Sequence, residues 1–88
     1  MSGVRERVAD AVDRYISERL KRLGKSPAAL ASSEDLFGEG VLDSVALTGL
    51  IAAVESAIER EIDFIDVDPD ALGTRDGIVA ELARAAGP

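Results

Sequence analysis

The sequence predicts an all-α fold, a four-helix bundle with three main helices, one short helix and a long loop between helices 1 and 2. Apolar residues recur at helical spacing in three segments, and capping residues and glycines stand at the ends of these segments. The one stretch that alternates like a strand has no second strand to pair with. With 88 residues, the chain is expected to form a single domain over residues 1–88.

The first helix is predicted from Val4 to Leu23. Its apolar residues follow one another at intervals of three or four, which places them in one stripe along a helix. Gly24 is expected to end the helix, and Lys21 and Arg22 are favourably placed near the negative end of its dipole. The stripe consists of Val4, Val8, Val12, Tyr15, Ile16, Leu20 and Leu23.

A long connection runs from Lys25 to Asp43. It contains Pro27, serines and glycines, and it has too little periodicity to form one regular element. Loops of this length in a small domain are usually functional or disordered. Its apolar residues favour order, because they are spaced like anchors that hold the loop against a core: Leu30, Leu36, Phe37 and Leu42.

The second helix is predicted from about Ser44 to Glu61, with Asp43 as its N-cap. Gly49 inside it should cost on the order of 1 kcal/mol relative to alanine. Close approach of a neighbouring helix or a partner would explain this glycine, but a merely tolerated residue is the preferred interpretation. The apolar face is formed by Leu47, Leu50, Ile51, Val54 and Ile58.

Residues 63–68 are interpreted as an extended linker whose apolar side chains point inward. Asp68 is predicted to cap a single turn over residues 69–72, with proline at its first position and Gly73 at its end. Thr74 is predicted to cap the last helix. That helix should bury Ile78, Val79 and Leu82.

Composition excludes several classes of function. The chain has no histidine and no cysteine, so the usual general base, the thiol nucleophile and the commonest metal ligands are all missing, and autonomous catalysis is not expected. The N-terminus has no apolar signal region, and the longest apolar stretch, residues 45–54, is roughly half of a membrane span. The expected protein is a soluble, cytoplasmic monomer that does not bind membranes.

The net charge of −7 is unevenly distributed. Residues 1–25 hold seven basic and four acidic residues, and the remainder holds three basic and thirteen acidic residues, so the two parts carry +3 and −10. The acidic part would repel nucleic acid, and only three aromatic residues could stack on bases. It could instead steer the chain toward a basic partner, although solubility explains the charge equally well.

Asp66, Asp68 and Asp70 match the first three ligand positions of a calcium-binding loop. The positions that require a glycine and a bidentate glutamate hold Ala71 and Gly77 instead. No dedicated metal site is therefore expected.

Ser44 is the main candidate for function, because it is a hydroxyl at the junction between the long loop and an apolar-faced helix. On its own, a serine at a helix start is more often only a cap. The order of the motifs around Ser44 along the sequence is more specific. Asp-Leu-Phe-Gly stands at 35–38, the Asp43–Ser44 pair at the junction, and Thr-Arg-Asp-Gly-Ile-Val at 74–79. In this order the chain resembles, over almost its whole length, the carrier-protein family, the acyl carrier proteins of fatty acid and polyketide synthesis and their aminoacyl and peptidyl relatives.

The resemblance implies an acyl-carrier-like fold and a role as a carrier rather than an enzyme. In the family, the matching serine receives 4′-phosphopantetheine from coenzyme A through a magnesium-dependent transferase. Ser44 would then be the attachment residue, and Asp43 would present it or assist metal binding. The thiol of the arm would carry acyl intermediates as thioesters between biosynthetic enzymes. The implied partners are a phosphopantetheinyl transferase, acyl- or aminoacyl-activating enzymes, and ketosynthases or acyltransferases.

The main hypothesis is a free-standing acyl carrier of polyketide, fatty acid or specialised metabolism. The alternative is an aminoacyl or peptidyl carrier, of D-alanyl-carrier type or nonribosomal peptide type. Many fatty-acid carriers have acids directly after the serine, whereas residues 45–50 are nearly neutral here. The upstream residues 41–43 also lack the glycine pair of peptidyl carriers, and Arg75 replaces a residue that is more often apolar in the family. The surface expected to bind partners consists of Glu39, Val45, Thr48, Glu55 and Glu59.

Two other classes of protein are alternatives to a carrier. A small helical adaptor that binds partners without modification would use Ser44 only as a cap, and Ser44→Ala would leave partner binding intact. An enzyme or a DNA-binding regulator is disfavoured by the missing base and by the acidic charge.

Overall fold

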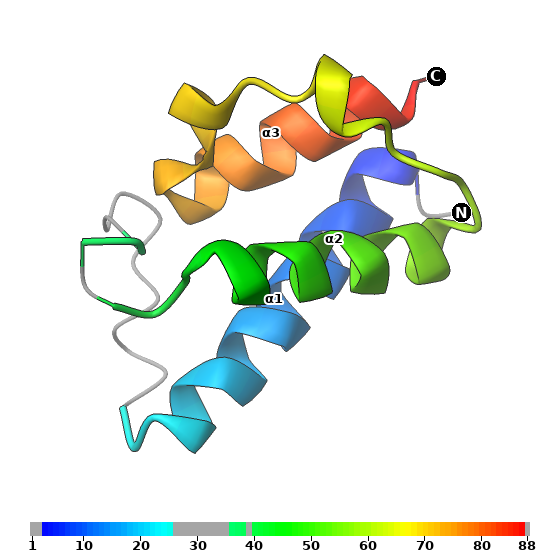
Figure 1. Cartoon of the computed structure of the whole chain (residues 1–88). Helices are drawn as coiled ribbons and strands as arrows, with labels where there is room; N and C mark the ends of the chain where they lie inside the picture. Colours follow the sequence, from blue (N-terminus) through cyan, green and yellow to red (C-terminus); the bar gives the residue numbers. More distant parts are fainter. Residues whose placement is uncertain (1–2, 26–35, 39, 88) are drawn as a thin grey trace.

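The computed structural model describes residues 3–25, 36–38 and 40–87 (Figure 1). These residues form three α-helices, α1 (Val4–Arg22), α2 (Ser44–Ile58) and α3 (Arg75–Ala86), with no strand among them. Two 3-10 helices, η2 (Phe64–Asp66) and η3 (Pro69–Gly73), lie between α2 and α3. The all-α class is confirmed: the short helix predicted over residues 69–72 is present as η3, and η2 is an additional 3-10 turn.

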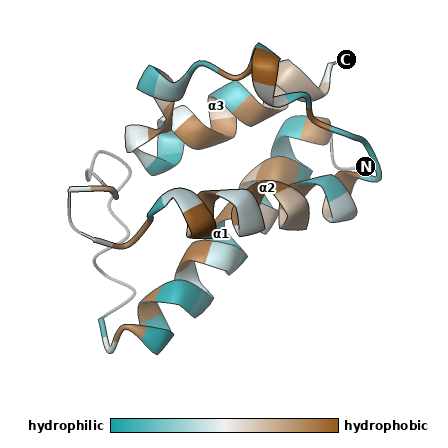
Figure 2. Cartoon of the chain, in the orientation of Figure 1, coloured by the Kyte–Doolittle hydropathy of each residue, from teal (hydrophilic) through white to brown (hydrophobic). Residues whose placement is uncertain are grey.

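Helix α1 holds the fold together, because it packs against both α2 and α3. In Figure 1, α2 crosses in front of α1, and α3 lies above α2 in the view. The short helix η3 leads into the start of α3. Hydrophilic and hydrophobic residues alternate along α1 and α3, whereas α2 is mostly apolar (Figure 2). Two large apolar side chains, Val45 and Ile65, lie on the surface.

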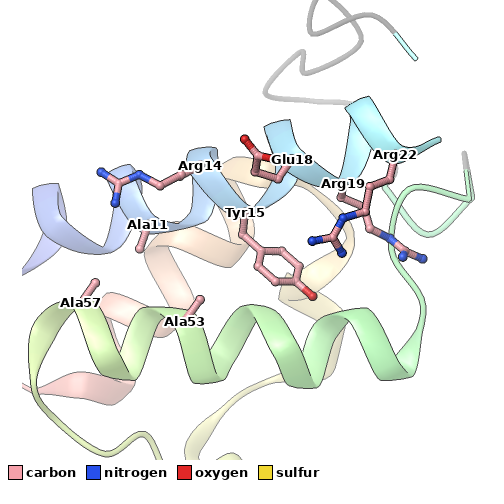
Figure 3. A pocket seen from close by; sticks show the side chains of 8 residues that line it. All are labelled: Ala11, Arg14, Tyr15, Glu18, Arg19, Arg22, Ala53 and Ala57. Carbon is pink, nitrogen blue, oxygen red and sulfur yellow. The ribbon is translucent and has the colours of Figure 1, made fainter. Parts of the chain in front are cut away.

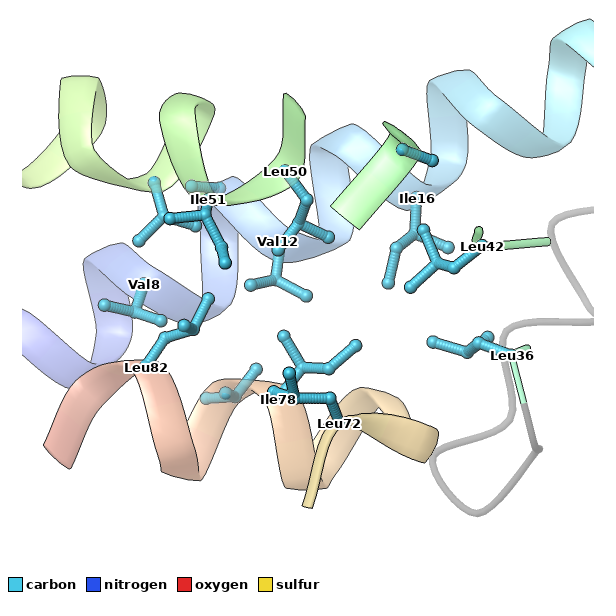
Figure 4. Close-up of a cluster of buried hydrophobic side chains, with 14 of the residues drawn as sticks. Val8, Val12, Ile16, Leu36, Leu42, Leu50, Ile51, Leu72, Ile78 and Leu82 are labelled. Carbon is cyan, nitrogen blue, oxygen red and sulfur yellow. The ribbon is translucent and has the colours of Figure 1, made fainter. Parts of the chain in front are cut away.

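The buried core contains no polar or charged residue among those described. Burial of this apolar surface is the main force that holds the three helices together. Figure 4 shows the side chains from α1, α2 and α3 meeting in one cluster, together with residues of the loop that precedes α2. Among its least exposed members are Val8, Val12, Ile16, Leu20, Leu36, Leu50, Val54, Ile78 and Leu82.

The end of α1 is as predicted from the sequence, except that Leu23 is exposed. Gly24 has a positive φ of 71°, and the backbone N–H groups of Gly24 and Lys25 donate to the carbonyls of Lys21 and Leu20, which is the Schellman arrangement of a helix end. Leu23 was expected in the buried stripe, but its side chain is 41% exposed. It is the C-cap residue, so it lies beyond the turn that faces the core.

Helix α2 ends at Ile58, three residues before the predicted end at Glu61. Glu59 adopts the left-handed conformation with φ 56°, and its N–H still donates to the Glu55 carbonyl. The Glu55 carboxylate then accepts a hydrogen bond from the Ile62 backbone N–H at 2.8 Å. Glu55 thus holds the chain that leaves the helix, an interaction that the apolar pattern does not reveal.

The segment after α2 is not a simple extended linker, because residues 64–66 form η2. In this turn the strand-like alternation is lost, so the predicted inward position of Ile65 is wrong: its side chain is 90% exposed. Val67 is buried as expected. The side chain of Phe64 lies outside the described part of the structure.

The caps predicted for the last two elements are confirmed. The Asp68 carboxylate accepts from the Asp70 N–H at 3.0 Å, and the Thr74 hydroxyl accepts from the Gly77 N–H at 3.1 Å. These bonds account for Asp68 without an ion. Among the described residues, no cluster of three potential metal ligands is present, and no helix has the length and apolar character to cross a membrane.

Candidate functional site

The position of Ser44 is fixed by the short segment before α2. The Leu36 N–H donates to the Gly73 carbonyl at 2.8 Å, and the Leu36 carbonyl accepts from the N–H groups of Val41 and Leu42 at 2.9 and 3.0 Å. Gly40, with φ 76°, allows the tight turn between them. Because Leu36, Val41 and Leu42 are also buried, the start of α2 is fixed to η3 and to the core.

The anchoring role predicted for Leu36 and Leu42 is therefore confirmed. Phe37 differs, since 37% of its surface is exposed. Leu30 and Glu39 lie outside the described residues, as do residues 26–35 as a whole.

Asp43 is the N-cap of α2, as predicted. Its Oδ1 accepts from the Ala46 N–H at 2.8 Å, and its carbonyl accepts from the Leu47 N–H at 2.8 Å. Its other carboxylate oxygen lies 3.4 Å from Nη2 of Arg19, whose Nε donates to the Val41 carbonyl at 3.0 Å. Arg19 thus braces the chain entering α2 from the side of α1.

Ser44 is the first residue of α2 and its side chain is exposed. Since Asp43 caps Ala46 and the ladder begins at Leu47, the N–H groups of Ser44 and Val45 have no intrahelical acceptor. An exposed hydroxyl next to free N–H groups and the positive end of a helix dipole can bear an anionic substituent.

The residues expected to bind partners fall into two groups. Val45 is 82% exposed, and Thr48 is exposed one turn further along, with its hydroxyl donating to the Ser44 carbonyl at 3.0 Å. Glu55 and Glu59 lie at the other end of α2, a helix of 15 residues and thus about 22 Å in length. The structure therefore places Val45 and Thr48 beside Ser44 and the two glutamates far from it.

A groove between α1 and α2 was not anticipated from the sequence. It has a volume of about 260 Å³ and begins at Arg19, next to Asp43. Gly49, Ala53 and Ala57 recur every four residues on α2, and this run of small side chains is the signal in the sequence that could have predicted a close neighbour. Tyr15 of α1 packs over Gly49, so close approach, rather than mere tolerance, explains the glycine.

Arg75, which replaces an apolar residue of the resembled family, has its own partner in this chain. Its Nε and Nη2 donate to the two carboxylate oxygens of Asp13 at 2.7 and 2.8 Å, and its Nη1 donates to Asp76 at 2.9 Å. The hydrogen bond to Asp13, and next that to Asp76, raise the pKa of the Arg75 guanidinium above its ordinary value. A bidentate ion pair therefore joins the start of α3 to α1.

A comparison with curated proteins gives one informative similarity. Over 48 residues the chain is 35% identical to a protein of Staphylococcus saprophyticus, and the matched stretch covers 54% of this chain and 62% of the relative. That relative is a D-alanyl carrier protein. The match supports a relationship to carrier proteins, while comparison with family models and with solved structures returns no match.

Proposed function

We propose that this chain is an aminoacyl carrier protein that bears 4′-phosphopantetheine on Ser44. The observation that carries the proposal is the exposure of Ser44 at the first position of α2, directly after a capping aspartate in a segment fixed to the core. The similarity to a D-alanyl carrier protein supports the same role and favours aminoacyl cargo over the fatty or polyketide acyl cargo of the first hypothesis.

The residues around Ser44 fit a phosphodiester. The free N–H groups of Ser44 and Val45 and the helix dipole favour a negative charge at this position. The high exposure of Val45 leaves room around the hydroxyl for a second protein to approach. The arm itself would supply the thiol that this cysteine-free chain lacks.

Attachment requires that the Ser44 oxygen form a bond to the phosphorus of the pantetheine moiety while the pyrophosphate bond of coenzyme A breaks and adenosine 3′,5′-bisphosphate leaves. The hydroxyl proton must pass to a base. This chain has no histidine, so we assign the base to the transferase. Asp43 is already bonded to Ala46 and paired with Arg19, and its role is to present Ser44 in a fixed geometry.

The neutral front of α2 supports cargo and partners different from those of fatty acid synthesis. Its first turn has no acidic residue, and Val45 and Thr48 are the exposed side chains that follow Ser44. A partner enzyme would therefore meet an apolar side chain and a hydroxyl next to the arm. The charges that could attract it, on Glu55 and Glu59, lie at the other end of α2.

Intact-mass spectrometry tests the attachment. The folded protein is incubated with coenzyme A, magnesium and a broad-specificity phosphopantetheinyl transferase. We expect a gain of one phosphopantetheine per chain, no gain for Ser44→Ala, and a normal gain for Ser56→Ala, which removes another exposed serine of α2. An unmodified wild-type chain would contradict the proposal, as would equal modification of Ser44→Ala.

The cargo class is tested on the modified protein. It is offered to a panel of activating enzymes for amino acids, including a D-alanine ligase, and to fatty acyl and malonyl transferases, and the bound thioester is identified by mass. We expect loading by at least one amino acid ligase in preference to the acyl transferases. Equal or better loading by fatty acyl transferases would refute aminoacyl cargo and restore the acyl carrier hypothesis.

A further inference from the structure

The groove between α1 and α2 combines an apolar floor with a cationic edge (Figure 3). Ala11, Ala53 and Ala57 line it together with the Tyr15 ring, and the charged residues around it are Arg14, Glu18, Arg19 and Arg22. In Figure 3, the guanidinium groups of Arg19 and Arg22 lie on the side of α1 that faces α2, whereas Glu18 points away from α2. The Arg19 guanidinium pairs with Asp43, the residue before Ser44. The edge nearest Ser44 is therefore the positively charged one.

We propose that this groove holds the phosphopantetheine arm, with its phosphodiester beside Arg19 and Arg22 and its chain running over Ala53 toward Ala57. The inference rests on the proposed attachment to Ser44. It assigns a resting position to the arm in this chain and gives Arg22 a role in positioning it.

Charge is the first argument. A phosphodiester on Ser44 is an anion, and the guanidinium of Arg19 is within 3.4 Å of Asp43, the residue before Ser44. Arg19 itself is already paired with the Val41 carbonyl and Asp43. Arg22 is exposed and has no ion pair or hydrogen bond within the described part of the chain, so its guanidinium is free to bind a phosphate.

Shape is the second argument. Ala53 lies nine residues beyond Ser44 on α2, about 13 Å along the helix. The small residues Gly49, Ala53 and Ala57 of α2 all face α1. Tyr15 lines the groove between Arg19 and Ala53 (Figure 3), and its hydroxyl can bond an amide of the arm there. The arm has its phosphodiester at the serine and its amide groups further along the chain. The groove presents its arginines nearest Ser44 and the Tyr15 hydroxyl after them, so the matching groups follow one another in the same sequence.

Other surfaces fit the arm less well. The hollow at the far end of α2 is lined by Glu55, Glu59 and Glu61, which would repel the phosphodiester, and by Arg60, which already donates to the carbonyls of Ala86 and Gly87. The hollow between α1 and α3 is bordered by Glu6 and Asp76 and by two arginines. Arg75 is committed to Asp13, and Arg5 lies 14 residues before Arg19 on α1, about 21 Å from it along the helix. Of these three surfaces, only the α1–α2 groove begins at Arg19, beside the residue before Ser44, and carries in Arg22 a guanidinium with no ion pair among the described residues.

The test compares amide NMR spectra of the unmodified and phosphopantetheinylated protein. We expect signals of Tyr15, Ala53 and Ala57 to shift on modification, in addition to those adjoining Ser44. Ala53→Leu, which fills the floor, should abolish the shifts at Tyr15 and Ala57, and Ala52→Leu, on the exposed side of α2, should leave them unchanged. Arg22→Gln should reduce them, while Arg5→Gln on the same helix should not.

Three results separate failure of this inference from failure of the proposed function. If mass spectrometry shows no arm on Ser44, both are wrong. If the arm is present but the shifts stay near Ser44 or map to α3, the groove is not its seat and the carrier function stands. If the groove signals move only when the transferase is added to the unmodified protein, the groove is a partner surface and the inference is overturned.

Discussion

The hydroxyl of Tyr15 lies over Gly49 so closely that a Cβ added to Gly49 would stand 2.4 Å from the hydroxyl oxygen and 3.2 Å from the ring carbon that bears it. This contact sets the approach of α1 to α2 and thereby the width of the groove beside Ser44. It also gives a physical reason for a glycine inside a helix, where it would otherwise cost stability.

Gly49→Ala should therefore behave differently in two backgrounds. In a Tyr15→Leu protein, the alanine should raise the free energy of unfolding by about 1 kcal/mol through helix propensity alone. In the natural background, that gain should be lost to the clash with Tyr15. Urea unfolding of the four proteins measures the difference, and equal stabilisation in both backgrounds would show that the contact does not constrain Gly49.

Gly77→Ala should destabilise the junction of η3 and α3. An added Cβ would stand 2.0 Å from the Ala71 carbonyl oxygen, which is backbone and cannot rotate away. We expect a loss of about 1–3 kcal/mol in the free energy of unfolding, the usual cost of overpacking. Gly3→Ala is the control, because nothing lies within 4 Å of its added Cβ, and it should cost much less. Similar losses at both positions would contradict the tight contact.

Asp43→Ala should remove the cap of α2 and cost about 1 kcal/mol. Asp43→Asn retains an oxygen that can accept from the Ala46 N–H, so it should recover most of that loss although it removes the charge that faces Arg19. Hydrogen exchange at Ala46 should rise in the alanine variant and remain slow in the asparagine variant. Equal loss in both variants would assign the stability to the Arg19 ion pair instead.

Glu81 should make stability depend on pH in the acid range. Its hydrogen bond from Arg84, and then that from the Asp68 N–H, lower the pKa of Glu81, so the ionised form is favoured in the folded protein. The stabilisation is fully present above the usual glutamate pKa of about 4.3 and is lost as pH falls through the lower pKa of the folded state. The stability difference between the natural protein and Glu81→Gln should shrink below about pH 4. A difference that is constant with pH would refute this linkage.

The sequence predicts the helices well where the apolar pattern and the capping residues agree. Asp43, Asp68 and Thr74 each cap the element that they were expected to cap. A short side chain with an acceptor oxygen at the start of a helix can bond the backbone N–H groups of the first turn, so such caps can be predicted from the sequence. Ser44 as the candidate site follows from the same junction, read together with the family resemblance.

The remaining features depend on contacts between distant residues. Glu55 bonds the chain beyond the helix, Arg75 pairs with Asp13 across the fold, and Tyr15 covers Gly49. None of these pairs is adjacent in the sequence, and a local pattern does not specify which polar side chain finds which partner. At Ile65 the local pattern itself was misleading. Residues 63–68 alternate like a strand, but residues 64–66 form a 3-10 turn that exposes the Ile65 side chain.

The central claim is that Ser44 carries the phosphopantetheine arm, and fragment-level mass spectrometry tests it most directly. The protein is isolated after co-expression with a broad-specificity transferase, digested, and fragmented to locate the added mass. We predict one phosphopantetheine per chain on the Ser44 oxygen, and none on Ser17, Thr48 or Ser56. An added group on any of those residues, or its absence from Ser44, would contradict the account.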